Sequence, residues 1–552
     1  KLLANRGLVD KEEIERFLYP SFERDFHDPF LMKDMAKAVA RIGEAIEKKE
    51  RIMIFGDYDV DGITASAILM RALTKLGAAV SYRLPHRIDD GYGLREKFIK
   101  EFAKLEVKVA ITVDNGISSA VEVEMANELG IDVIITDHHT IPEKIPNAFA
   151  ILHPKLPGAG YPFAELTGAG VALKLASALL KTRTKDHDSE IKKLFDLACM
   201  GTIADIGSLR GENRYIVKEG LSVLEHTRWP GLSRLKESAG IKGKVNVHAI
   251  GFLLGPRINA AGRISHPSDA LKLLLQNEAH SEILAQQLEK LNTRRQQMMV
   301  ELMGIAYNMA EKQAADPVII ISHKDFHAGI IGLIAAKLSE KYFRPAIVME
   351  ERNEVFVGSC RSIPQINILE IITTGKEFLS HFGGHAAAAG FDLPKSNAAK
   401  FIKKVKTQAK SFIKPGEAKQ VLLVECELKH DEISKKTIET IGLFEPFGHD
   451  NEAPLFICRG LPVADFGTVG KEKNHLKVKF KIDSGLVDCI GFRLAEHLNT
   501  VKRAKKIDVV CEIEANTWNG RTTVQLKIID FKPVAMKQVE NVEDEEEGVE
   551  SY

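Results

Sequence analysis

The chain has 552 residues, which at roughly 100–200 residues per domain predicts three to four domains rather than one. Its 76 Lys and Arg balance its 76 Asp and Glu, but residues 537–552 hold seven acids and one Lys, so this tail carries −6 and the remainder +6. A content of 45% hydrophobic and 28% charged residues excludes a fibrous or wholly disordered chain. No run approaches the roughly 18 apolar residues of a membrane helix and no signal peptide is recognisable, so we expect no membrane association.

The six cysteines are scattered along the chain, and no two of them form a C-x-x-C pair. This spacing argues against a zinc module and against the disulfide framework of a small secreted domain. The cysteine pattern therefore indicates a reducing compartment, and we expect the protein in the cytoplasm.

The first half of the chain alternates strand-like and helix-like segments. Residues 1–48 are predicted to be an N-terminal helical segment. Residues 49–265 show apolar, β-branched runs separated by helical periodicity, which is typical of parallel βαβ units and predicts an α/β domain with a doubly wound parallel sheet. The predicted strands are residues 51–55, 107–113 and 131–136, and the predicted helices are residues 63–76 and 118–129.

A long helix is predicted over residues 266–315. Apolar side chains recur there at alternating spacings of three and four residues, with Arg295 interrupting the stripe. A coiled coil needs roughly three to four sustained heptads, which this run barely reaches. A connecting helix between domains is therefore the better interpretation.

A second α/β domain is predicted over residues 316–412. Two apolar runs, at 318–322 and 345–349, predict strands, and residues 329–341 between them have the pattern of a helix.

The pattern changes again over residues 418–534, where short strands with turn signals predict a small β-barrel. In the segment 475–482, apolar residues alternate strictly with Lys477, Lys479 and Lys481, which predicts a strand with one buried and one basic face. The acidic tail, residues 535–552, has too few apolar residues to fold and is expected to be disordered.

Acidic side chains directly follow the three predicted strands of the first sheet. Because the carboxyl ends of parallel strands meet at one edge, where such folds bind ligands, these side chains are expected to converge in one crevice. Like charges in such numbers raise each other's pKa and destabilise the fold, so bound cations must neutralise them. The side chains are Asp57, Asp59 and Asp61 after the first strand, Asp114 after the second, and Asp137, His138 and His139 after the third.

The residue types indicate which ion is bound. Carboxylates with one or two histidines and no thiolate suit Mn²⁺ or Mg²⁺. A further acid, Asp205, lies in an otherwise apolar run and is expected to be buried, where a metal would serve as its partner. Each acidic loop alone is more typical of a turn or a helix N-cap. Three such loops on one edge, together with a fourth acid, favour a site for two metal ions.

These residues resemble a known family. Asp57-Tyr-Asp-Val-Asp-Gly62, Asp114-Asn-Gly116, Asp137-His-His139 and Gly201-Thr-Ile-Ala-Asp205 are similar, in order, to the four motifs of the DHH phosphoesterase superfamily. Gly383-Gly-His-Ala-Ala-Ala-Ala-Gly-Phe391 resembles the signature of its accessory DHHA1 domain. Gly255-Pro-Arg-Ile-Asn-Ala-Ala-Gly-Arg263 and Gly358-Ser-Cys-Arg-Ser362 resemble stretches of the RecJ branch, which contains single-strand-specific 5′→3′ DNA exonucleases. The resemblance covers nearly the whole chain and implies the order DHH domain, long helix, DHHA1 domain, OB-fold.

The resemblance implies a role for each acidic motif. Asp114 would bridge two metal ions, Asp57 would support its loop, and His139 would contact the scissile phosphate. The small pyrophosphatases of the superfamily have a further histidine ligand where this chain has Phe55, so one metal is expected to have an open position filled by water. The implied metal ligands are Asp59, Asp61, Asp114, His138 and Asp205.

The resemblance also implies the residues that bind the substrate. Glycines that let backbone N–H groups approach phosphate are expected in the DHHA1 signature, although tight helix packing by Gly and Ala explains its alanines equally well. Arg257 and Arg263 could also be ordinary surface residues. The implied contacts are Ser359 and Arg361 for a 5′-terminal phosphate, Arg87 for the same pocket, Arg257, Asn259 and Arg263 for the strand near the cleavage point, Gly384 and His385 for phosphate, and His327 at a helix start that favours phosphate.

The barrel at 418–534 is expected to be an OB-fold, a common platform for single strands that combines basic grooves with stacking aromatic residues. Trp518 and Phe466 are candidates for stacking on bases, with a place in the core as the alternative for either.

The resemblance implies a 5′→3′ exonuclease specific for single-stranded DNA, which releases 5′-mononucleotides in recombination and repair. It further implies a monomer, with a single-strand-binding protein and a RecQ-type helicase as partners. A phosphodiesterase for short oligonucleotides or cyclic dinucleotides is the alternative, but those relatives are generally two-domain proteins without the barrel. A non-catalytic replication scaffold is a third possibility, and such proteins typically lose motif acids that are all present here.

Overall fold

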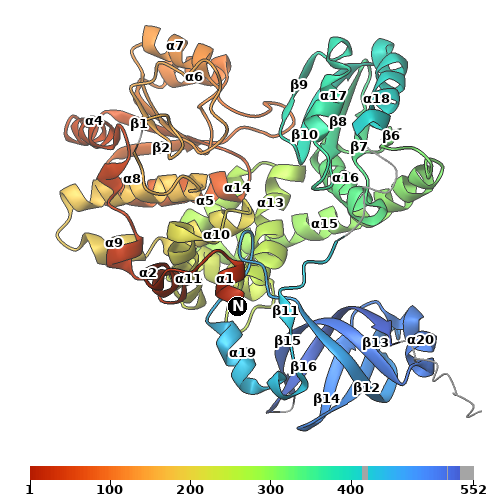
Figure 1. The fold of residues 1–552 in the computed structure, drawn as a ribbon. Coiled ribbons are helices and arrows are strands. Elements are labelled where there is room, and N and C mark those ends of the chain that lie inside the picture. The colour runs from red at the N-terminus through yellow and green to blue at the C-terminus, as the bar shows by residue number, and fades with distance from the viewer. Residues whose placement is uncertain (159, 413–420, 519, 535–552) are drawn as a thin grey trace, which may run out of the picture. The chain divides into compact units, whose positions relative to one another are not determined.

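Two compact units make up this protein. The structure, a computed structural model, describes residues 1–158, 160–412, 421–518 and 520–534, without the Trp518 side chain (Figure 1). The larger unit comprises residues 15–421 and 446–451, and the smaller comprises residues 1–14, 422–445 and 452 onward. The acidic tail that we expect to be disordered lies outside the described residues.

The larger unit begins with a five-stranded parallel sheet in the order β2-β1-β3-β4-β5. The three strands predicted from the sequence are confirmed as β1, β3 and β4, and they are the central ones. The outer strands β2 and β5 were not predicted. The strands are β1 Arg51–Gly56, β2 Ala79–Arg83, β3 Val107–Val113, β4 Asp132–Thr136 and β5 Ala150–Leu152.

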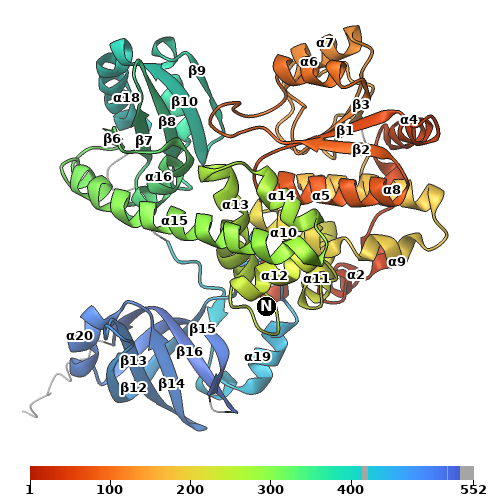
Figure 2. The ribbon, with the colours of Figure 1, turned by 180° about the vertical axis from the view of Figure 1, so that it is seen from behind.

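Helices cover both faces of this sheet, as expected for a doubly wound fold (Figures 1 and 2). Side chains alternate along β1, so Ile52 and Ile54 pack into one hydrophobic core, whereas Met53 and Phe55 pack into another on the opposite face. The first core contains residues of α4 Met35–Glu47, α5 Val60–Lys75 and α8 Gly168–Arg183, and the second contains residues of α6 Glu96–Lys104 and α7 Ala120–Glu128.

A layer of helices follows the sheet in the chain. The long helix predicted at 266–315 is two helices, because the backbone is extended at Gln276 and Asn277. The second of them, α15, has 34 residues and leads to the next α/β domain (Figure 2). None of the described helices is long and apolar enough to cross a membrane. The helices are α9 His187–Lys192, α10 Phe195–Ala204, α11 Gly211–Glu225, α12 Pro230–Ser238, the π-helix η2 Ala249–Leu254, α13 Gly255–Ile264, α14 Ser268–Leu275 and α15 Glu278–Glu311.

The second α/β domain contains a mixed sheet in the order β6-β7-β8-β10-β9. The two predicted strands and the helix between them are confirmed. The explanation of the Gly- and Ala-rich segment by helix packing is wrong, since this segment forms a strand, a tight turn at His385–Ala388 and a second strand. The elements are β6 Ile319–His323, α16 Ala328–Tyr342, β7 Ala346–Glu351, β8 Val355–Arg361, α17 Ile368–Thr373, β9 His381–Gly384, β10 Ala388–Pro394 and α18 Ala398–Phe412.

The smaller unit contains the predicted barrel. Its strand order is β11-β12-β13-β14-β16-β15, and a further pairing of β12 with β15 closes the barrel. Along β13 the apolar side chains are buried, and the three lysines lie on the outer face, as predicted. The elements are β11 Cys426–Glu427, α19 Lys435–Gly442, β12 Phe456–Val469, β13 His475–Ile482, β14 Gly485–Gly491, α20 Leu498–Arg503, β15 Lys506–Trp518 and β16 Arg521–Pro533.

The first residues of the chain belong to the barrel unit. Arg6 forms an ion pair of 2.6 Å with Glu425 and donates a hydrogen bond to the Glu452 carbonyl, and Asn5 donates to the Glu425 carbonyl. The expected N-terminal helical segment is therefore divided. Helix α1 Leu2–Asn5 packs with the barrel, whereas α4 covers the parallel sheet.

Candidate metal and phosphate site

The acidic loops at the carboxyl ends of β1, β3 and β4 converge around one histidine. His138 Nε2 lies 3.0 Å from Asp114 Oδ1, 3.6 Å from Asp205 Oδ2 and 3.8 Å from Asp61 Oδ2. Three overlapping groups have potential ligand atoms within 4.8 Å of one another: Asp57, Asp59 and Asp114; Asp61, His138 and Asp205; and Asp114, His138 and His139.

Two of these carboxylates are fixed by helix N-termini. Asp59 accepts a hydrogen bond of 3.2 Å from Gly62 N–H and so caps α5. Asp61 is 1% exposed and accepts hydrogen bonds of 2.7 and 2.9 Å from Gly168 and Ala169 N–H at the start of α8. The N-cap explanation thus holds for Asp59, but it does not exclude a metal role because a carboxylate offers two oxygens and several lone pairs.

Asp114 lies in a strained backbone conformation. Its φ of 61° is in the left-handed region, which few residues other than Gly adopt. Its N–H donates to the Thr136 carbonyl at 2.9 Å, which continues the β3–β4 ladder, and the side chain of Asn115 donates to the Val113 carbonyl. Such strain clusters at functional sites, where surrounding contacts hold it in place. Here it directs the Asp114 carboxylate at His138.

The two adjacent histidines differ in protonation state. His139 Nδ1 donates a hydrogen bond of 2.8 Å to Asp137. Although burial lowers the pKa of His139, this bond and the neighbouring carboxylates raise it to about 9. Burial and the positive charge of His139 lower the pKa of His138 to about 3. At neutral pH, His138 is therefore a neutral potential ligand and His139 is a cation.

The carboxylates have the electrostatic properties of a cation site. Burial, followed by repulsion from neighbouring acids, raises the pKa of Asp61 to about 7 and of Asp205 to about 8, and also raises those of Asp57 and Asp114. Among the described residues, Asp57 Oδ1, Asp114 Oδ1 and His138 Nε2 are buried and form no hydrogen bond, since the 3.0 Å approach of Asp114 to His138 does not have hydrogen-bond geometry. Carboxylate oxygens and an imidazole nitrogen that lack hydrogen bonds and lie in one cluster are suitable ligands for a divalent ion.

Asp205 differs from its prediction. It was expected to be buried in an apolar run, but it follows the last turn of α10 and its side chain is 31% exposed. The apolar run is the helix itself, and the acid emerges from its end into the site. A helix end, rather than a core position, therefore brings this fourth acid to the cluster.

Metal removal should make the stability of the protein depend on pH. The folded-state pKa values of Asp61 and Asp205 lie above the ordinary value of 3.8, so these two carboxyls hold more protons in the folded protein than in the unfolded chain between about pH 4 and 8. In EDTA, we therefore expect the melting temperature to fall as the pH rises from 6 to 8.5. Mn²⁺ should restore stability most strongly at high pH, because it binds the deprotonated ligands.

Differential scanning fluorimetry at pH 6, 7 and 8.5, with EDTA or Mn²⁺, measures this effect. Asp205→Asn should flatten the decline in EDTA. A melting temperature in EDTA that rises over this range would contradict the assignment.

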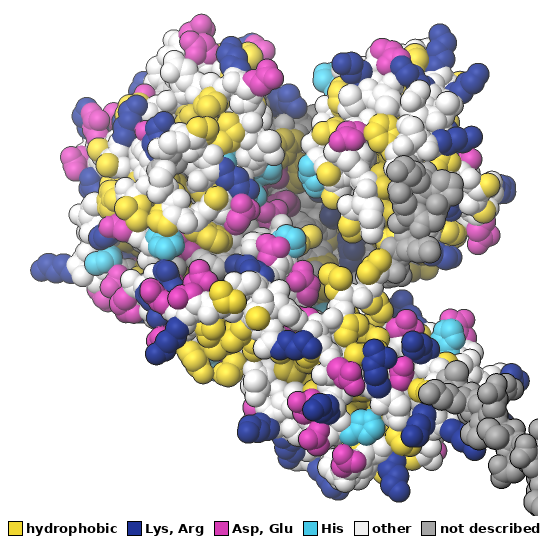
Figure 3. Space-filling model, viewed as in Figure 1, with side chains coloured by type: hydrophobic (Ala, Val, Ile, Leu, Met, Phe, Trp, Pro, Cys, Tyr) yellow, Lys and Arg dark blue, Asp and Glu magenta, His cyan; other side chains and the backbone are white. Residues whose placement is uncertain are grey.

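A group of arginines lies beside the carboxylates. Burial, together with the charges of Arg87, Arg295 and Arg361, lowers the pKa of Arg263 to about 9. Burial and the charge of Arg87 also lower the pKa of Arg361. Within the part of the chain that the structure describes, Arg87, Arg263 and Arg361 form no ion pair with an acid. Figure 3 shows acidic and histidine side chains along the hollow between the two α/β domains of the larger unit. Unpaired, half-buried cations of this kind fit a phosphate group.

The second α/β domain supplies further residues that were expected at the phosphate. Ser359 and Arg361 lie on the same face of β8, against α16, where a Cβ added at Gly332 would come within 3.1 Å of Ser359 Oγ and 3.4 Å of an Arg361 nitrogen. Burial, followed by the positive charges of Arg361 and His139, lowers the pKa of His385. Gly384 has a φ of 145° and no room for a side chain, so the turn before His385 requires glycine.

Two expected contacts, Arg257 and His327, have partners inside the protein, and a third, Asn259, lines a cavity. Arg257 forms an ion pair of 2.5 Å with Glu289, which joins α13 to α15. His327 Nδ1 accepts a hydrogen bond from Gly329 N–H and caps α16. Asn259 lines a cavity of about 370 Å³ that also contains Arg263 and Arg295. To contact the substrate, Arg257 and His327 would have to bind it in addition to these partners or in place of them. Their contact with the substrate stays a prediction.

Tyr92 is a site residue that the sequence did not reveal. Its hydroxyl lies within 3.4 Å of both ring nitrogens of His139 and 3.3 Å from the Asp114 carbonyl. Gly91 and Gly93 on either side have positive φ values of 73° and 80°. The Gly-Tyr-Gly spacing was the available signal, because an aromatic residue held between two left-handed glycines is presented by the loop rather than packed in a core.

Comparison with known families divides the chain into three regions. Residues 51–202 match the N-terminal domain of the DHH family, residues 310–411 match the DHHA1 domain, and residues 424–530 match the RecJ OB domain. These three regions coincide with the parallel-sheet domain, the second α/β domain and the barrel, and this order confirms the fold expected from the resemblance.

Several known proteins are similar over nearly the whole chain. The single-stranded-DNA-specific exonuclease RecJ of Bacillus subtilis (strain 168) is 37% identical over 534 residues, which cover 96% of this chain and 67% of that protein. RecJ of Thermus thermophilus in complex with Mn²⁺ superposes with a TM-score of 0.83 at 29% identity, covering 97% of this chain and 76% of that one. The Mg²⁺ complex from the same organism gives a TM-score of 0.76 at 28% identity, covering 97% and 74%.

Proposed function

The chain belongs to the RecJ family of single-stranded-DNA-specific exonucleases, and we propose that it removes nucleotides from the 5′ end of single-stranded DNA and releases 5′-mononucleotides. One observation supports this proposal above the others. A cluster of carboxylates and a neutral histidine lies, in the same unit, beside arginines that form no ion pair with any acid that the structure describes. Such a site can hold metal ions at the scissile phosphate and a second phosphate at the strand end.

The metal cofactors are two divalent ions, Mn²⁺ or Mg²⁺, and the donor set fits them. We assign Asp59, Asp61, Asp114, His138 and Asp205 as their ligands. Bound there, the ions would activate water and stabilise the entering and leaving oxygens of an in-line displacement.

The chain's own residues orient the phosphate. His139, a cation held by Asp137, can donate a hydrogen bond to a phosphate oxygen as negative charge builds there. Tyr92 limits the positions of the His139 ring. No side chain is needed as a covalent nucleophile.

We assign recognition of the 5′ end to the arginine group. Arg361 and Ser359 project from one face of β8. Arg87 and Arg263 belong to the part of the larger unit that contains the parallel sheet, and their charges act on Arg361 or on each other. Three guanidinium groups that have no acidic partner in the described part of the chain can neutralise a terminal phosphate dianion through charge-assisted hydrogen bonds. A 5′-phosphate bound there would place the first phosphodiester bond toward the carboxylates.

The barrel supports the exonuclease over the phosphodiesterase for short oligonucleotides or cyclic dinucleotides. It matches the RecJ OB domain over residues 424–530 and has a basic outer face on β13. Phe466 is 39% exposed, which favours stacking on a base over a place in the core. The side chain of Trp518 lies outside the described residues. From the family resemblance we add that the protein acts as a monomer, in recombination and repair, with a single-strand-binding protein and a RecQ-type helicase as partners.

One assay tests the proposal directly. Single- and double-stranded DNA, labelled at either end, should be incubated with the protein in Mn²⁺ or Mg²⁺. We expect a label on the 5′ nucleotide of single strands to appear at once as a mononucleotide, while a 3′ label remains on a shortening strand. Release of the 3′ label first, or equal cleavage of duplex DNA, would overturn the assignment of direction or of strand specificity.

The lysines of β13 should contribute to the binding of long strands. Each phosphate contact adds about 0.7 to the slope of log affinity against log salt for single strands, so replacing Lys477, Lys479 and Lys481 by Gln should lower the slope by about 2. Fluorescence anisotropy with a long single strand over a salt series measures this change. Three exposed lysines of the larger unit, Lys108, Lys144 and Lys242, provide the matched control. An unchanged slope in the β13 variant would show that DNA does not bind this face.

These substitutions test the barrel better than its removal does. Residues 446–451 belong to the larger unit, where the His449 carbonyl accepts a hydrogen bond of 2.9 Å from Leu209 N–H and the Asp450 carbonyl accepts one from Arg210. A truncation before residue 446 would therefore also remove residues that the larger unit contacts.

A further inference from the structure

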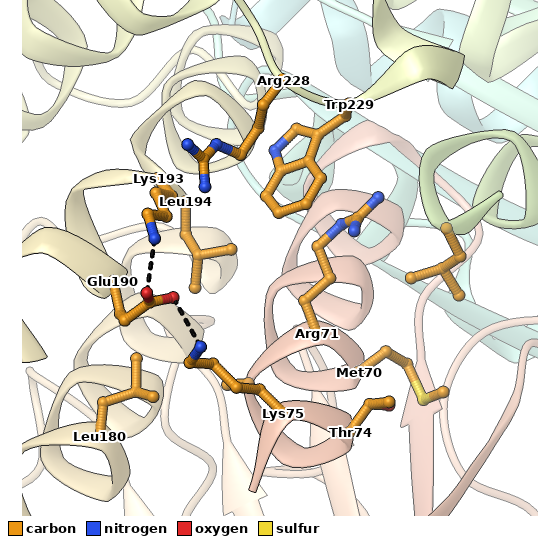
Figure 4. Close-up of a pocket in the computed structure, with 12 residues that line it drawn as sticks. Met70, Arg71, Thr74, Lys75, Leu180, Glu190, Lys193, Leu194, Arg228 and Trp229 are labelled. Atoms are coloured by element: carbon orange, nitrogen blue, oxygen red, sulfur yellow. Dashed lines mark hydrogen bonds and ion pairs between the residues drawn. The ribbon is translucent and has the colours of Figure 1, made fainter. Parts of the chain in front are cut away.

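A second cavity lies at the end of helix α5 that is remote from the carboxylates. Asp61 is in the first turn of α5, whereas Met70, Arg71 and Lys75 in its last turns line this cavity (Figure 4). At 1.5 Å per residue, Arg71 is about 15 Å from Asp61 along the helix. The cavity has a volume of about 420 Å³, which is within the range of small-molecule sites. It is therefore separate from the nuclease site.

The walls of this cavity carry an excess of positive charge. Four cations, Arg71, Lys75, Lys193 and Arg228, line it together with one acid, Glu190. Glu190 forms ion pairs with both lysines, as Figure 4 shows. Neither arginine has an ion pair with any described residue. The formal charge of the lining is thus +3, with two cations that lack an acidic partner.

Arg71 is the more unusual of the two arginines. Its guanidinium stacks on the Trp229 ring at 3.5 Å and donates a hydrogen bond to the Leu274 carbonyl, but its buried Nε has no partner among the described residues. Burial lowers its pKa to about 10. A buried donor of this kind costs free energy unless an acceptor satisfies it, and an anion in the cavity would bring negative charge to this cation.

The indole beside it is held in place. Trp229 Nε1 donates a hydrogen bond of 3.2 Å to Asp196, which also accepts one of 2.6 Å from the Thr227 hydroxyl. Leu180, Leu194 and Leu275 add apolar surface to the lining. The cavity therefore combines a preorganised aromatic ring and an apolar wall with cations. Figure 4 shows Arg228 and Lys193 extending toward the same part of the cavity.

We propose that this cavity binds a nucleoside phosphate, with the base against the apolar wall and the Trp229 ring and the phosphate between Arg228 and Lys193. An inorganic anion would use the cations alone and leave the apolar wall in water. An uncharged planar molecule would leave the excess positive charge of the lining without a counter-charge. A phosphorylated molecule with a planar base satisfies both parts of the lining, and this site does not depend on the proposed nuclease function.

Tryptophan fluorescence can report on this site directly, because the chain has only two Trp residues. A Trp518→Phe variant leaves Trp229 as the single reporter. In EDTA, titration with AMP should change the emission saturably, whereas ribose 5-phosphate and inorganic phosphate should bind at least about tenfold more weakly. Calorimetry on the unmodified protein should give the same affinity for AMP.

Substitutions then locate the binding. Arg228→Gln, at an exposed side chain, should weaken AMP binding at least about tenfold, while Arg228→Lys should retain part of it. Lys185→Gln, an exposed cation that does not line the cavity, is the matched control and should bind AMP normally. The Arg228 variants and Lys185→Gln should all hydrolyse DNA at the wild-type rate. A failure of AMP binding can therefore be distinguished from a failure of the proposed nuclease function. The proposal is overturned if Trp229 does not respond, if Arg228→Gln binds AMP normally, or if inorganic phosphate binds as tightly as AMP.

Discussion

Replacing Asp114 by Asn is expected to reduce DNA hydrolysis at least roughly 100-fold. Asp114 Oδ1 lies 3.0 Å from His138 Nε2, and its carboxylate belongs to two of the three potential ligand groups, so its loss affects the whole cluster. The loss of a side chain that merely supports a metal ligand costs roughly 10–100-fold. Removal of the ligand that is shared between the groups should cost more.

Asn is the informative substitution at this position because of the backbone. The φ of 61° is tolerated by Asn, whereas a left-handed conformation costs other residues roughly 1–2 kcal/mol. Asp114→Asn should therefore melt in EDTA no lower than the wild type and still bind single-stranded DNA. Initial rates at saturating Mn²⁺ measure the effect. Asp269→Asn, which removes a half-buried acid paired with Lys272, is the control. Near-normal turnover of the Asp114 variant would rule out the two-metal assignment.

The sequence predicted the catalytic sheet and the acids at its edge for one physical reason. The central strands of a parallel sheet are buried on both faces, so they are visible as apolar, β-branched runs, and their carboxyl ends must share an edge. Asp59, Asp114 and His138 converge because each follows the carboxyl end of one of these strands. The alternation of Lys with apolar residues along β13 was equally visible, because a half-buried strand has a period of two.

The remaining features depend on contacts that local patterns do not encode. Tyr92 reaches His139 from a loop whose path is set by two glycines; the Gly-Tyr-Gly spacing indicates that the loop presents an aromatic side chain, but not that this side chain contacts His139. Arg6 pairs with Glu425 more than four hundred residues away, which divides the N-terminal segment between the two units. The Ala-rich part of the DHHA1 signature has the composition of a helix, but its pairing with β8 makes it a strand. In each case tertiary contacts override a local preference.

Replacing Arg361 by Gln is expected to lower the hydrolysis of 5′-phosphorylated strands roughly 10- to 150-fold. The loss of a charge-assisted contact to phosphate costs on the order of 1.5–3 kcal/mol, and each 1.4 kcal/mol is a factor of about ten. Strands with a 5′-hydroxyl lack the dianion that this cation would neutralise, so their hydrolysis should change little. The ratio of kcat/KM for the two substrates, in wild type and variant, measures the selectivity.

The surroundings of Arg361 make this ratio a test of its role rather than of the fold. Gln retains an amide that can replace the 2.8 Å hydrogen bond from Arg361 to the Cys360 carbonyl, and removing one of several neighbouring positive charges relieves their repulsion. Arg352→Gln, which breaks an ion pair with Glu350 on the same sheet, controls for a general loss of charge. Arg361→Lys should recover only part of the selectivity, because an ammonium group keeps the charge but lacks the planar fork of guanidinium. An equal loss on both substrates would mean that Arg361 acts on the cleavage step or on the position of β8, and the 5′ end would then have to be bound by Arg87 and Arg263 alone.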